Sequence, residues 1–99
     1  MSHASWEQFY RAVNVLASGT GSLRERLGDA LVMLSPLQQQ DIPDYIRDDY
    51  FKLWGRIEAA EDPRGVGLVH AFARGLDEAE AARVANQILD FYTEVARMG

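Results

Sequence analysis

The chain has 99 residues, with 15 acidic and 10 basic side chains and a formal net charge of −5. This length leaves room for one domain, the 47% apolar content excludes a disordered chain, and the lack of cysteine excludes disulfides, thiolate metal sites and thiol nucleophiles. Neither a secretion signal nor an apolar run of about 18 residues occurs. We therefore predict a single helical domain over residues 1–99, located in the cytoplasm and not in a membrane. The negative charge makes direct nucleic-acid binding unlikely to be its function.

The first predicted element is an amphipathic helix that begins at Ser5. The residues Ser5 to Gln8 have the form of a capping box, in which a serine hydroxyl and a glutamine side chain satisfy free amides. Apolar residues then recur at steps of three and four and share one helix face. They are Trp6, Phe9, Tyr10, Val13, Leu16 and Ala17. Two glycines within residues 18–21 end this helix.

A second capping box at Ser22 to Glu25 predicts a helix that runs to about Leu34. Its apolar stripe contains Leu23, Leu27, Ala30, Leu31 and Leu34. A proline is tolerated in the first turn of a helix, so Pro43 predicts that the third helix starts between residues 41 and 43. The core stripe of that helix contains Ile46, Tyr50, Leu53 and Ile57.

The C-terminal part of the chain predicts a loop over residues 61–65 and then one or two helices. Residues 66–74 fit either a strand or a short helix, and we predict a helix because no second strand is apparent. Leu76 and Asp77 begin the last helix, which ends near Gly99. Its inner face contains Ala81, Val84, Ala85, Ile88, Tyr92 and Val95, flanked by Leu89 and Phe91. The sequence thus predicts an all-α fold, a small four- or five-helix bundle with mostly antiparallel neighbours and short connections.

Aromatic residues give the third helix an unusually wide apolar face. Phe51 and Trp54 lie beside its core stripe and widen the apolar arc to about 160°, which one neighbouring helix does not easily cover. Either the core of one chain buries these rings, or they pack against a second copy or another protein. The predicted interface consists of Tyr45, Tyr50, Phe51 and Trp54. Our leading hypothesis is a small non-enzymatic protein-interaction or regulatory domain of a bacterium, acting as a homodimer or with another protein.

An acidic cluster at the start of the third helix offers an alternative. Its members are Asp41, Asp44, Asp48 and Asp49. The simpler interpretation is that acids near a helix N-terminus interact favourably with the helix dipole. In the alternative, this acidic surface belongs to an inhibitor or antitoxin-like partner of a nucleic-acid enzyme.

Few residues point to catalysis, a metal or DNA. His70 is a candidate general base, although a partly buried structural histidine is the favoured interpretation. His3 and Glu7 have the spacing of half a metal site, but two ligands do not hold a transition metal well. Arg24 and Arg26 begin the second helix of a possible helix-turn-helix, whose basic character nearby acids dilute. We therefore predict neither an enzyme nor a cofactor or metal.

Overall fold

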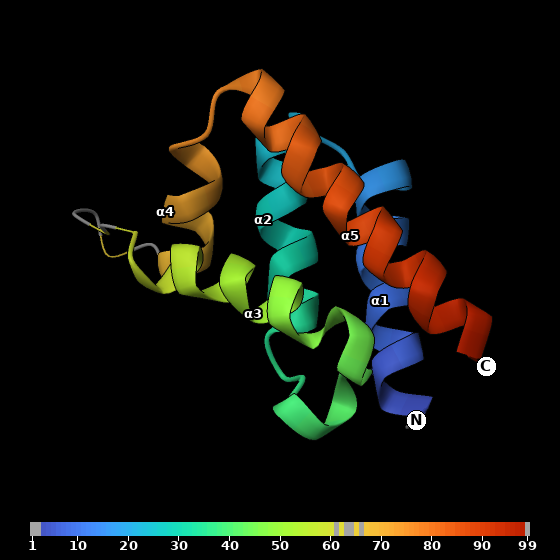
Figure 1. The fold of residues 1–99 in the computed structure, drawn as a ribbon. Helices are drawn as coiled ribbons and strands as arrows, with labels where there is room; N and C mark the ends of the chain where they lie inside the picture. Colours follow the sequence, from blue (N-terminus) through green and yellow to red (C-terminus); the bar gives the residue numbers. More distant parts are fainter. Residues whose placement is uncertain (1–2, 61, 63–64, 66, 99) are drawn as a thin grey trace.

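The computed structural model describes residues 3–60, 62, 65 and 67–98, and the side chains of residues 3, 4 and 98 lie outside this description. Within these ranges the chain forms five α-helices and one short 3₁₀ helix, with no strand (Figure 1). The α-helices are α1 (His3–Ser18), α2 (Leu23–Leu34), α3 (Asp44–Glu58), α4 (Leu68–Arg74) and α5 (Glu78–Met98), and the 3₁₀ helix η1 is Gln39–Asp41. The predicted all-α bundle is confirmed.

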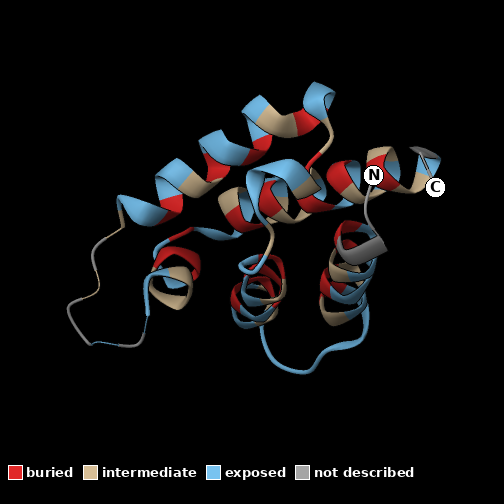
Figure 2. Ribbon diagram, turned by 90° about the horizontal axis from the view of Figure 1, so that it is seen from below, coloured by how far each residue is buried: buried red, intermediate tan, exposed pale blue. Residues whose placement is uncertain are grey.

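The helices gather around one core. Helix α1 packs against α2 and α5 and runs antiparallel to both, whereas α3 lies across the bundle and α4 packs on α2 (Figure 1). Helix α3, which follows the connection through η1, is the exception in a bundle of mostly antiparallel neighbours. In each helix the buried residues lie on the side that faces the other helices (Figure 2). The largest fully buried residues are Phe9, Leu27, Leu31, Leu34, Ile42, Tyr50, Leu53, Ile57, Ile88 and Val95.

Two of the predicted helix starts are confirmed by hydrogen bonds. The Ser22 hydroxyl accepts the amide hydrogen of Glu25 at 3.2 Å, which caps α2. At α5, Asp77 Oδ1 accepts the amide hydrogen of Glu80 at 2.7 Å, and Glu80 Oε1 accepts that of Asp77 at 3.3 Å. The bond from the Glu80 amide lowers the pKa of the Asp77 carboxyl.

The start predicted at Ser5 is wrong. Helix α1 already includes His3, and Ser5 lies inside it with no exposed surface. The reason is its position, since Ser5 is in step with the buried residues Phe9, Ala12 and Leu16 along the core face of the helix. Ser5 is therefore a core residue and not a cap.

The ambiguous segment before α5 is helical. Helix α4 covers Leu68–Arg74, while Val66 lies outside the described residues. It packs closely on α2 at Gly28, where a Cβ atom would lie 2.6 Å from Nδ1 of His70. The missing side chain of Gly28 thus allows the two helices to approach each other.

Candidate functional site

Tyr50, one of the four aromatics predicted at an interface, lies in the core. It is 1% exposed, and its ring meets those of Phe9 and Phe91 edge-on at centroid distances of 5.8 and 5.5 Å. Burial raises the pKa of its phenol, and the hydroxyl donates to the carbonyl oxygen of Leu34 at 3.3 Å. The assignment of Tyr50 to an accessible surface is therefore corrected.

The other three predicted interface residues differ in their exposure and in their contacts within the chain. Tyr45 is exposed, but its hydroxyl donates to the carbonyl oxygen of Glu94 on α5 at 2.9 Å. Phe51 is 37% exposed and packs edge-on against Tyr50 at 5.2 Å, and Trp54 is partly buried against the core. Much of the aromatic surface of α3 is thus used within the chain.

Two of the four clustered aspartates have structural roles. Asp41 accepts the amide hydrogen of Gln38 at 2.9 Å and so caps η1. Asp44 forms an ion pair with Arg47 at 2.7 Å in the first turn of α3. Asp48 and Asp49 are exposed on the same helix.

The arginines weighed as DNA contacts donate hydrogen bonds to the fold itself. Arg24 Nη1 donates to the carbonyl oxygen of Leu76 at 3.2 Å, which ties α2 to the start of α5. Arg26 Nη1 donates to the carbonyl oxygen of Leu16 at 2.6 Å, one of the carbonyls left without an intrahelical partner at the end of α1. Both side chains therefore support the junctions between helices.

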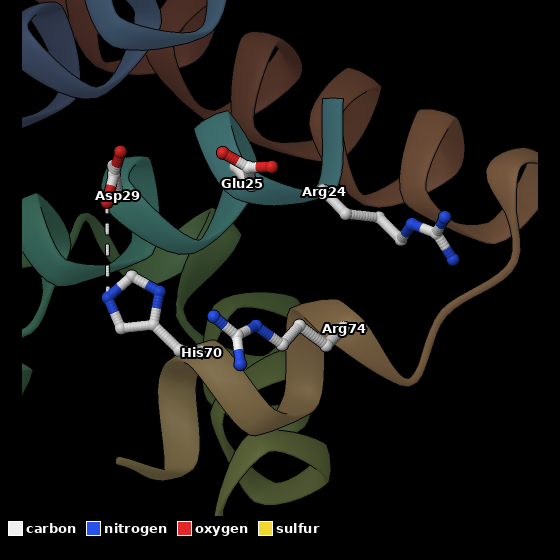
Figure 3. A pocket seen from close by; sticks show the side chains of 5 residues that line it. All are labelled: Arg24, Glu25, Asp29, His70 and Arg74. Atoms are coloured by element: carbon white, nitrogen blue, oxygen red, sulfur yellow. Dashed lines mark ion pairs between the residues drawn. The ribbon is translucent and has the colours of Figure 1, made fainter. Parts of the chain in front are cut away.

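His70 lines a shallow pocket of about 190 Å³ between α2 and α4, together with Arg24, Glu25, Asp29 and Arg74. Its Nε2 lies 3.9 Å from Asp29 Oδ1, and Arg74 extends toward it while Arg24 extends away (Figure 3). None of these five side chains carries a hydroxyl or a thiol, the groups that a histidine base commonly activates in nucleophilic catalysis. The packing of His70 on Gly28 accounts for its position.

The described residues contain no group of three or more histidine, aspartate or glutamate side chains that could hold a metal ion. The predicted half-site at His3 and Glu7 depends on a His3 side chain that lies outside this description. Nor does any helix in the described part of the chain combine the length and apolarity needed to cross a membrane.

A different surface emerges along α1 and α5. Each of these helices has a buried stripe at steps of four, three and four residues, namely Ser5, Phe9, Ala12 and Leu16 on α1, and Val84, Ile88, Phe91 and Val95 on α5. One residue further along, each helix has a second stripe with the same spacing. We call these two stripes together the α1/α5 strip, and it consists of Trp6, Tyr10, Val13 and Ala17 with Ala85, Leu89, Tyr92 and Ala96.

The two halves of the α1/α5 strip adjoin, and large parts of them face solvent. Trp6, Tyr10 and Leu89 are 37%, 45% and 40% exposed. The rings of Trp6 and Tyr10 stack at 5.4 Å with an angle of 5° between their planes, and Tyr10 reaches Tyr92 across the helix boundary at 6.4 Å. No member of the strip carries a charge. The residues one position beyond it include the neutral Asn14 and Thr93 and the exposed charged residues Glu7, Arg11, Asp90 and Arg97.

Sequence reasoning placed the α1 members of the strip, together with Ala85 and Tyr92, on the inner faces of their helices, with Leu89 beside that face and Ala96 unassigned. The structure corrects that expectation for Trp6, Tyr10 and Ala17, which are exposed. The width of the apolar arc was used as a signal for the third helix only. On α1 the six predicted apolar residues span about 120°, and the arc widens to about 160° when the buried Ala12 is included. That signal, applied to every helix, would have identified α1.

The chain matched no protein-family model, no curated protein and no solved structure. Its fold class is that of a small all-α bundle, and its function has to be inferred from its own surfaces.

Proposed function

We propose that this protein is a non-enzymatic protein-interaction domain, which binds an uncharged, apolar surface of a protein partner through the α1/α5 strip. The observation that supports the proposal is the strip itself. In a chain with 25% charged residues, two neighbouring helices present a continuous apolar stripe with three large side chains exposed by 37% to 45%. Depletion of charge together with enrichment in Tyr and Trp is typical of the centres of protein interfaces.

The spacing of the strip supports the same conclusion. Steps of four and three residues keep side chains on one line along a helix, and such a line packs into the gaps between side chains of a facing helix. In α1 and α5 the first stripe is buried in the core, and the second stripe, the α1/α5 strip, can pack against a further layer of helices. A binding role thus accounts for apolar residues that the fold of one chain leaves partly exposed.

The rival functions have less support. An acidic mimic of nucleic acid would use Asp41, Asp44, Asp48 and Asp49. Of these, Asp41 caps η1 and Asp44 pairs with Arg47, while Asp48 and Asp49 are exposed on α3. An enzyme would use His70, which packs on α2 in a pocket that no hydroxyl or thiol side chain lines. The absence of cysteine fits a cytoplasmic setting.

A capture experiment with matched variants tests the proposal. Leu89→Glu places a carboxylate in the strip, whereas Val32→Glu makes a similar change at a 42% exposed apolar residue on α2, outside the strip. From a lysate of the host, tagged wild-type protein and Val32→Glu should retain the same partner, and Leu89→Glu should lose it. Retention of the same proteins by all three baits would contradict the proposed function.

A further inference from the structure

No further inference is drawn: the strongest candidate, the exposed apolar face that the α1/α5 strip forms along two neighbouring helices, belongs to the site already described, and nothing in the structure shows what covers it.

Discussion

Helix α3 and the α1/α5 pair are built on the same pattern but differ in one respect. All three helices have a buried stripe at steps of four, three and four residues, which in α3 is Ile46, Tyr50, Leu53 and Ile57. One residue further along, α3 has Arg47, Phe51, Trp54 and Glu58, so its second stripe begins and ends with a charge. The second stripes of α1 and α5 contain none. The charges among the aromatic residues are therefore what distinguishes the second stripe of α3 from the strip through which we propose that the protein binds.

Phe9 and Tyr10 are adjacent members of the two stripes of α1, and replacing them should give the largest difference in folding stability. Phe9 is fully buried against Tyr50 and Phe91, so Phe9→Ala should lower the free energy of unfolding by about 3–5 kcal/mol. Tyr10 is 45% exposed, and Tyr10→Ala should cost about 1 kcal/mol. Urea denaturation measures both, and equal losses would refute the division of α1 into a core stripe and a binding stripe.

The contact between Gly28 on α2 and His70 on α4 has no free space, in contrast to the exposed strip, and adding one methyl group at Gly28 tests this. Gly28→Ala forces a Cβ toward the His70 ring and should cost about 1–3 kcal/mol of folding stability. The same change in a His70→Ala background should cost markedly less, since the obstructing ring is gone. A double-mutant cycle of thermal melts measures the coupling. The absence of coupling would mean that His70 does not fill this contact.

The neighbours Tyr50 and Phe51 sharpen the comparison within α3. Tyr50→Phe removes the hydroxyl that donates to Leu34 and should cost about 1 kcal/mol of folding stability. Phe51→Tyr adds a hydroxyl to a partly exposed ring and should change stability by less than about 0.5 kcal/mol. Denaturant unfolding measures both variants. Equal changes in the free energy of unfolding for Tyr50→Phe and Phe51→Tyr would contradict the difference in burial between the two rings.

The smallest expected effect is a change in the pH dependence of the Tm when Asp77, the cap of α5, is replaced. This cap belongs neither to α3 nor to the α1/α5 strip. The pKa of Asp77 is lowered from 3.8 in the folded chain, so its carboxylate stabilises the fold above the unfolded pKa and loses this effect as the pH falls through the folded pKa. Asp77→Asn cannot titrate. The difference in Tm between wild type and this variant should stay constant above about pH 5 and change only below about pH 4. A difference that changes near neutral pH would point to another group.

Local signals made most helices predictable from the sequence. The caps at Ser22 and Asp77 depend on residues three positions apart, and both occur as expected. The core stripe of α3 is also confirmed residue by residue. Such features depend on the chain within one or two turns, so a sequence pattern is enough to identify them.

The candidate site was not predictable in the same way. A wide apolar arc shows that a helix has more apolar surface than one neighbour covers, but not which part stays open. In α1 that choice depends on where α3 and α5 lie, because Tyr50 and Phe91 pack against Phe9 while Tyr10 stays 45% exposed. The crossing position of α3, which brings Tyr50 against Phe9 and Phe91, is equally a tertiary property.

NMR of the isotope-labelled wild-type chain, alone and with an unlabelled lysate of the host, tests the central claim most directly. When the lysate is added, amide and side-chain shifts should change along the α1/α5 strip, above all at Trp6, Tyr10, Leu89 and Tyr92. The resonances of Tyr45 and Phe51 on α3 should stay in place. Shift changes confined to α3, with none along the strip, would contradict the claim that the α1/α5 strip is the binding surface of this protein.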